Sequence, residues 1–107
     1  MTTARRRLDR HPTGAQIRAA RGLLNMSVLD LSERTGLAVN TIKRAESTND
    51  FAPINRANAN LLLTTLEAAG VHFIPADGEL GAGVRLMNPD QAPLARRRTP
   101  PAAGSPD

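Results

Sequence analysis

The chain has 107 residues, a formal net charge of +4 and no cysteine. This length suits one small domain with tails, and without cysteine there is no disulfide scaffold, thiolate zinc site or cysteine catalysis. Its aromatic side chains are two phenylalanines, too few for the ring stacking typical of RNA and single-strand binders, and no apolar run approaches the roughly 18 residues that span a membrane.

The first helix is predicted to follow a short basic segment. Residues 1–12 are polar and basic, and we expect them to form a flexible arm. Thr13 and Gln16 have the spacing of a capping box, in which each side chain bonds the backbone N–H of the other residue. Apolar residues then recur at helical spacing, which predicts a helix at about 14–24. Its expected inward residues are Ile17, Ala20, Leu23 and Leu24.

Two short helices separated by a glycine turn are predicted next. Ser27 and Asp30 repeat the capping spacing and begin a helix at about 28–35. Gly36 stands where the end of that helix needs a positive φ angle. A further helix is predicted at 39–46. Ile42 and Ala45 face inward in this helix, and Val39, Asn40, Lys43 and Arg44 face outward.

A fourth helix is predicted at about 58–69, ending at Gly70. It is apolar around much of its circumference, so one stripe can cover the core and another needs a partner. Leu61 and Leu63 can form a dimer seam or pack under the next element. The sequence leaves both arrangements open.

The C-terminal part is predicted to be a hairpin and a tail. Residues 71–74 and 84–87 are short strand candidates, with proline and glycine turn residues between them. From Asn88 onward the chain holds five of its eight prolines, and we expect residues 88–107 to be disordered. The expected fold is therefore mainly α. A small helical bundle with a helix-turn-helix and a short C-terminal β-hairpin occupies residues 13–87, between disordered tails.

The two short helices and their turn have the pattern of a helix-turn-helix. In this unit the second helix enters the major groove of DNA and offers its outward N-terminal residues to base edges. Asn40 can pair with adenine, and Lys43 or Arg44 can pair with guanine or phosphate. The charge distribution agrees, because residues 1–56 carry ten Lys/Arg against five Asp/Glu, and a basic region favours a polyanion.

Together these segments resemble the lambda-repressor/Cro-type helix-turn-helix family, often called XRE. The resemblance covers residues 15–46 and extends less firmly to residues 66–71. It is carried by Ile17-Arg18-Ala19-Ala20-Arg21, by Leu31-Ser32-Glu33-Arg34-Thr35-Gly36-Leu37, by Thr41-Ile42-Lys43-Arg44-Ala45-Glu46 and by Leu66-Glu67-Ala68-Ala69-Gly70-Val71. The resemblance implies a cytoplasmic, nucleoid-associated transcriptional regulator without a cofactor, which binds double-stranded DNA as a homodimer with half-site centres roughly 34 Å apart.

By position, the resemblance also assigns roles to individual residues. It places the DNA contacts at Ser27, Val28, Val39, Asn40, Thr41, Lys43 and Arg44. It implies an ion pair between Arg21 and Glu46 that ties the first helix to the end of the third. Three positions depart from the family pattern. Val28 replaces a frequent Gln, Ala38 replaces a capping Ser or Thr, and Ser32 replaces a small Ala and needs a hydrogen-bond partner for its hydroxyl.

The alternative function is a protein-interaction module, such as the antitoxin half of a toxin–antitoxin pair, with or without DNA binding. A small toxin-like reading frame beside the gene would favour this alternative. We expect no enzymatic activity, because the sequence has no nucleophile–base set and no phosphate-binding loop. We also expect no metal site, because His11 and His72 stand apart and no ligand pattern surrounds them.

Overall fold

A computed structural model of the protein describes residues 10–90. Within this range lie the helices α2 (Gly14–Leu24), α3 (Val28–Thr35), α4 (Val39–Ala45) and α5 (Arg56–Ala68), followed by the antiparallel strands β1 (Val71–Ile74) and β2 (Gly83–Leu86). The predicted mainly α fold with a C-terminal hairpin is confirmed. Most of the predicted arm and tail, residues 1–9 and 91–107, lies outside the described residues.

Helices α2 and α3 begin at the capping boxes that the sequence predicts. The Thr13 hydroxyl accepts from the Gln16 N–H at 3.0 Å, and the Gln16 side chain accepts from the Thr13 N–H at 2.9 Å. The Ser27 hydroxyl accepts from the Asp30 N–H at 2.9 Å. Helix α3 ends at Gly36 with φ 79°, the left-handed conformation that a residue without Cβ adopts at little cost.

The bounds of α5 differ from the prediction by two residues at its start. The Asn55 side chain accepts from the Asn58 N–H at 2.7 Å and caps a helix that begins at Arg56 instead of residue 58. At the other end α5 stops at Ala68, and Gly70 follows with φ 113°. Asn is a residue type that favours the N-cap, so the sequence does hold a local signal for the observed start of α5.

The core lies where the four helices and the hairpin meet. Its largest fully enclosed side chains, each 0 % exposed, are Ile17, Leu24, Leu31, Ile42, Leu62, Leu66 and Val71. Leu23 was predicted to face inward, but it is 36 % exposed. The face of α2 that packs on the core is the one formed by Ile17, Ala20 and Leu24, each 0 % exposed. On α5, Leu63 is 2 % exposed and packs within this chain, whereas Leu61 is 36 % exposed.

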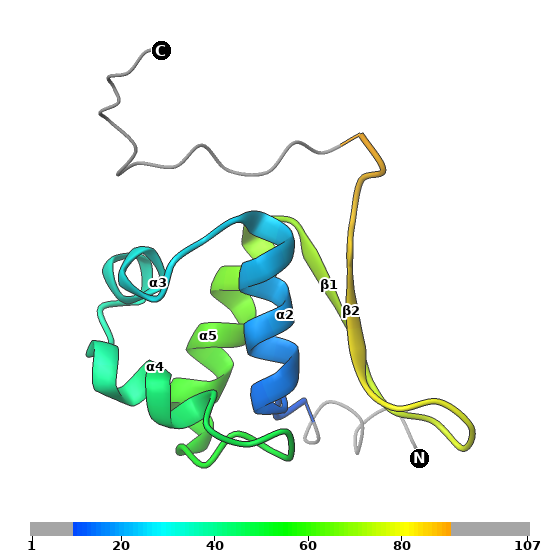
Figure 1. Ribbon diagram of the computed structural model, residues 1–107, viewed down its shortest axis with the longest axis horizontal. Helices are drawn as coiled ribbons and strands as arrows, with labels where there is room; N and C mark the ends of the chain where they lie inside the picture. The colour runs from blue at the N-terminus through cyan, green and yellow to red at the C-terminus, as the bar shows by residue number, and fades with distance from the viewer. Residues whose placement is uncertain (1–9, 91–107) are drawn as a thin grey trace.

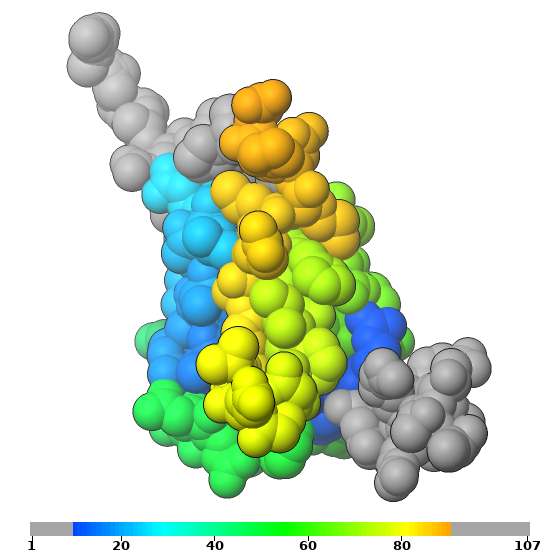
Figure 2. Space-filling view, turned by 90° about the vertical axis from the view of Figure 1, so that its right-hand side faces the viewer, coloured from blue at the N-terminus to red at the C-terminus, as the bar shows by residue number. Residues whose placement is uncertain are grey.

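The hairpin covers one side of the helices. Strand β2 packs on α2 and β1 packs on α5, on the opposite side of these helices from α3 and α4 (Figure 1). Figure 2 faces this side and shows the strands running up the molecule beside α2. The Gln16 side-chain amide fastens the hairpin to α2, because it donates to the carbonyl of Ile74 at 3.1 Å and to that of Gly83 at 2.9 Å.

Residues 10–12, which were predicted to belong to the flexible arm, are packed against the fold. Arg10 forms an ion pair with Glu67 at 2.6 Å. The His11 ring nitrogen Nε2 lies 2.8 Å from the Ala52 carbonyl, and the Ala52 N–H donates to the Pro12 carbonyl at 3.0 Å. These contacts come from residues forty or more positions away, so local composition gave no sign of them.

Candidate nucleic-acid interface

Helices α3 and α4 are joined by the three-residue turn 36–38, which the side chains of α3 hold in place. The Ser32 hydroxyl donates to the Leu37 carbonyl at 2.6 Å and so finds the partner that its position requires. The Thr35 hydroxyl accepts from the Leu37 N–H at 3.1 Å, and the Gly36 N–H donates to the Ser32 carbonyl at 2.8 Å. The direction in which α4 leaves α3 is therefore fixed by hydrogen bonds.

Helix α4 has one buried face and an uncapped start. Ile42 and Ala45 are 0 % exposed and join the core. Ala38 has the extended backbone of an N-cap, with φ −64° and ψ 147°, but no side chain that can accept from the first N–H groups of the helix. Helix α4 is therefore held mainly by tertiary contacts along its inner face and at its C-terminal end.

An ion pair ties the end of α4 to α2. Arg21 Nε lies 2.7 Å from Glu46 Oε2, and Arg21 Nη2 lies 2.8 Å from Glu46 Oε1, a two-pronged contact at the positions where the family resemblance implies an ion pair. The Glu46 side chain is 8 % exposed and that of Arg21 is 20 % exposed. Arg21 also donates to the Met26 carbonyl at 3.1 Å, so one guanidinium contacts both ends of the helix-turn-helix region.

Two further contacts at this end of α4 were missed by the sequence analysis. Arg18 donates to the carbonyls of Glu46 and Thr48, at 2.5 and 3.3 Å, and to the side chain of Asn49. Gly14 lets α2 approach the same backbone, because a Cβ at Gly14 would lie 2.1 Å from the Thr48 oxygen and 2.7 Å from the Ala45 oxygen. Neither contact has a local sequence signal, since both join residues about thirty positions apart.

The outer face of α4 carries polar side chains that remain open to solvent. Asn40, Lys43 and Arg44 are exposed, and Val39 and Thr41 are half-buried beside them. The side chains of Asn40, Lys43 and Arg44 form no hydrogen bond or ion pair with another residue of the 10–90 range. Their amide and cationic groups are therefore available to an external hydrogen-bonding partner.

The two site residues predicted at the start of α3 offer fewer open polar groups. The Ser27 hydroxyl is engaged as the N-cap, and the Ser27 N–H faces the Asp30 carboxylate at 3.4 Å. Val28 is half-buried and packs against the core. Of the seven predicted DNA contacts, the three on the outer face of α4 thus have the most open polar groups.

Residues 10–90 contain no cluster of three or more His, Cys, Asp or Glu that could hold a metal ion. No helix in this range has both the length and the apolar content needed to cross a membrane. No protein-family model, no curated protein and no solved structure matches the chain.

Proposed function

We propose that this protein is a transcriptional regulator that binds double-stranded DNA with α4 in the major groove. One observation carries the proposal: the exposed outer face of α4 holds Asn40, Lys43 and Arg44 with no partner among the described residues, while Ile42 and Ala45 on the opposite face are 0 % exposed. An amide can pair with adenine, and a cationic side chain can pair with guanine or phosphate. The proposal places the protein on the nucleoid in the cytoplasm.

The contrast with neighbouring arginines supports this assignment. Arg18 and Arg21 are engaged by carbonyl and carboxylate oxygens, and both hold α4 against α2. Lys43 and Arg44 lie on α4 itself, and their side chains form no such contact with the described residues. A positioned helix with unengaged donors suits base and phosphate contact, because little side-chain rearrangement is needed before binding.

The proposal includes a homodimer on a two-fold-related site. Two reading helices separated by about one helical turn of DNA, roughly 34 Å, would occupy successive major grooves. The exposed Leu61 on α5 is a candidate contact between subunits, because it is a large apolar side chain that remains 36 % exposed in the single chain.

The test is fluorescence anisotropy with labelled duplexes over a salt series, using DNA from upstream of the gene and a shuffled duplex of equal composition. Asn40→Ala should weaken binding to the upstream duplex by about 5- to 150-fold, which corresponds to about 1–3 kcal/mol, and should reduce discrimination. Lys43→Ala should weaken binding to both duplexes and lower the salt slope by about one phosphate contact. Arg85→Ala is the matched control, because it removes an exposed cation on the hairpin side.

Two results would contradict the proposal. If the parent and Asn40→Ala bound the upstream duplex with equal affinity, Asn40 on α4 would not read a base. If Lys43→Ala and Arg85→Ala lowered the DNA affinity equally, the binding would depend on the overall charge of the protein and not on the position of Lys43 on α4. Weak binding that is the same on both duplexes would direct attention to the alternative function, an antitoxin-like protein-interaction module.

A further inference from the structure

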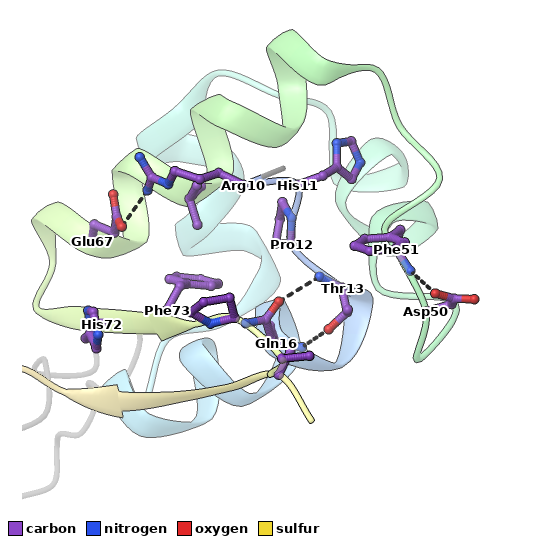
Figure 3. A pocket seen from close by; sticks show the side chains of 14 residues that line it. Arg10, His11, Pro12, Thr13, Gln16, Asp50, Phe51, Glu67, His72 and Phe73 are labelled. Atoms are coloured by element: carbon purple, nitrogen blue, oxygen red, sulfur yellow. Dashed lines mark hydrogen bonds and ion pairs between the residues drawn. The ribbon is translucent and has the colours of Figure 1, made fainter. Parts of the chain in front are cut away.

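A cavity of about 800 Å³ lies between the segment 10–13, α5 and the hairpin (Figure 3). Its walls come from five places: the segment 10–13, Gln16 of α2, residues 50–51 of the loop after α4, one face of α5, and the hairpin with its turn. The volume falls within the range of about 300–1,000 Å³ that is typical of sites for small organic molecules. The proposed DNA contact does not use this cavity.

The cavity gathers the ring side chains of the protein. The chain has two Phe, two His, no Trp and no Tyr, and all four rings belong to residues that line this cavity. Phe73 points from β1 toward the segment 10–13, and Phe51 stands at the far end, while His72 lies at the outer margin (Figure 3). Phe51 is 62 % exposed and meets the His11 ring edge-on, with 6.4 Å between ring centroids.

An exposed phenylalanine beside a cavity indicates a surface that a ligand can cover. Burial of apolar area stabilises a complex in proportion to the area removed from water. Aromatic rings also prefer offset or edge-on contact with other rings. Phe51, Phe73 and Leu63 provide such apolar surfaces here, so the chemistry of the lining favours a planar aromatic ligand.

The charges of the lining limit the ligand further. Asp50 and Glu67 are acidic, and Arg10 is the basic residue among those that line the cavity. Arg10 is already paired with Glu67 at 2.6 Å. The Asp50 carboxylate accepts from the Phe51 N–H at 2.8 Å and points away from the other lining residues (Figure 3). With Arg10 paired to Glu67, the lining still has one negative charge in excess, which disfavours an anionic ligand relative to a neutral or cationic one.

One wall of the cavity continues into the segment that holds α4. The Gly14 N–H donates to the Asp50 carbonyl at 2.9 Å, and Thr13 pairs with Phe51 in an isolated antiparallel bridge. Two residues before Asp50, the Thr48 carbonyl accepts from Arg18, which also bonds the end of α4. A ligand against Phe51 therefore contacts a short stretch of backbone that leads directly to α4.

We propose that this cavity binds a planar aromatic small molecule that is neutral or cationic, and that its occupancy is transmitted through residues 48–51 to the end of α4. A role of this cavity as an effector site for DNA binding rests on the proposed function. The binding of a ligand and its effect on α4 are independent of that function, and both can be measured without DNA.

The absence of Trp and Tyr from the chain provides a direct assay. Indole, tryptamine and indole-3-acetate share one fluorescent ring and differ in charge, and excitation of that ring meets no protein background. With the full chain, the anisotropy of indole and tryptamine should rise saturably, with dissociation constants in the micromolar to millimolar range expected of ligands this small. Indole-3-acetate should bind at least about threefold more weakly than indole, because its carboxylate adds a negative charge to a lining that already has one in excess.

Variants locate the site. Phe51→Ala should weaken indole binding by about fivefold or more. It should leave the far-ultraviolet circular dichroism unchanged, since Phe51 is 62 % exposed and lies outside the core. Leu80→Ala is the matched control, because Leu80 is an apolar residue that is 71 % exposed and does not line the cavity. Its affinity for indole should equal that of the parent.

Amide chemical shifts of the ¹⁵N-labelled chain test the transmission. Indole should move the amide signals of Phe51 and Phe73, and also those of Glu46 and Thr48, while that of Leu80 stays in place. Shifts confined to the lining would overturn the transmission to α4. The site itself would be overturned by any of three results: no saturable change with the three probes up to about 5 mM, equal affinity for indole and indole-3-acetate, or parental affinity in Phe51→Ala.

Discussion

Helices α3 and α4 are neighbours of almost equal length, eight and seven residues, but they are stabilised in different ways. Helix α3 begins at a capping box and ends at a left-handed glycine, so both of its ends are satisfied by residues adjacent in sequence. Helix α4 begins at Ala38 without a side-chain cap, and the groups that hold its end are Arg18 and Arg21 of α2. The helix with the open polar face is thus the one that depends on a distant element.

This difference has a physical consequence. A helix of seven residues is too short to be stable alone in water, because nucleation costs more than its few hydrogen bonds return. Helix α4 therefore keeps its position only while the rest of the fold holds it, through its buried inner face, the hydrogen-bonded turn after α3 and the contacts from α2. Substitutions in α2 should disturb the outer face of α4 without touching it, whereas substitutions at the caps of α3 should act locally.

Gly14→Ala should have the largest effect, since the new methyl group would lie 2.1 Å from the Thr48 oxygen and 2.7 Å from the Ala45 oxygen. The backbone atoms must move, and we expect a loss of about 3 kcal/mol in the free energy of unfolding. Urea denaturation followed by circular dichroism measures it. Gly22→Ala is the control in the same helix, because nothing lies within 4 Å of its added Cβ.

Gly22→Ala should raise stability by about 0.5–1 kcal/mol, since alanine is the better helix former. The sign of the effect should therefore reverse between the two glycines of α2. A Gly14→Ala protein as stable as the parent would mean that α2 does not approach the end of α4 closely, and the dependence of α4 on α2 would lose its main support.

Glu46→Ala should come next. It removes both prongs of the contact with Arg21 and leaves the guanidinium, which is 20 % exposed, with the Met26 carbonyl alone. We expect a loss of about 2–3 kcal/mol, somewhat below the range for a fully buried pair because Arg21 can be partly hydrated. Glu79→Ala, an exposed carboxylate in the hairpin turn, should change stability by less than about 0.5 kcal/mol.

A double-mutant cycle with Arg21→Ala separates the pair from its surroundings. Additive losses would show that Glu46 and Arg21 act independently, and α4 would then be held by packing and by the hydrogen bonds from Arg18. A coupling of about 1 kcal/mol or more, little changed by added salt, would fit a partly buried pair that is weakly screened.

The contrast between α3 and α4 also shows which features the sequence could predict. The capping boxes at Thr13 and Ser27, and the glycine that ends α3, are local signals in which both partners lie within three residues. Such signals placed α2 and α3 at the observed bounds. The missing cap of α4 was also predicted, because alanine has no side-chain acceptor at any position.

Contacts between distant segments could not be predicted in this way. Gly14 looked like an ordinary first residue of a helix, although its lack of a Cβ is needed by a backbone more than thirty residues away. Gln16 was recognised as a cap, but its bonds to the hairpin were not foreseen. The cavity was missed for the same reason, since its rings at positions 11, 51, 72 and 73 come together only when the chain folds. The DNA contacts at Asn40, Lys43 and Arg44 stay predictions.

The smallest expected effect is a gain. Ala38→Ser places a hydroxyl at a residue whose φ of −64° and ψ of 147° already suit an N-cap, and it should raise the free energy of unfolding by about 0.5–1 kcal/mol. Ser27→Ala, which removes the cap of α3, should lower it by about 1 kcal/mol. Both changes are measured by urea denaturation, and together they make the starts of the two helices more alike.

If Ala38→Ser gave no gain, the start of α4 would already be satisfied by water, and the missing cap would not be a weakness. If it gave the expected gain, the second measurement would be DNA affinity. A serine at this position stiffens the first turn of α4, where Asn40 lies. A more stable protein with unchanged discrimination would show that the contacts of α4 with α2, α3 and the core already fix the geometry that the proposed DNA contact needs. Loss of discrimination in the stabilised protein would show that the uncapped turn has to adjust when it meets the bases, which is a reason for α4, unlike α3, to lack a cap.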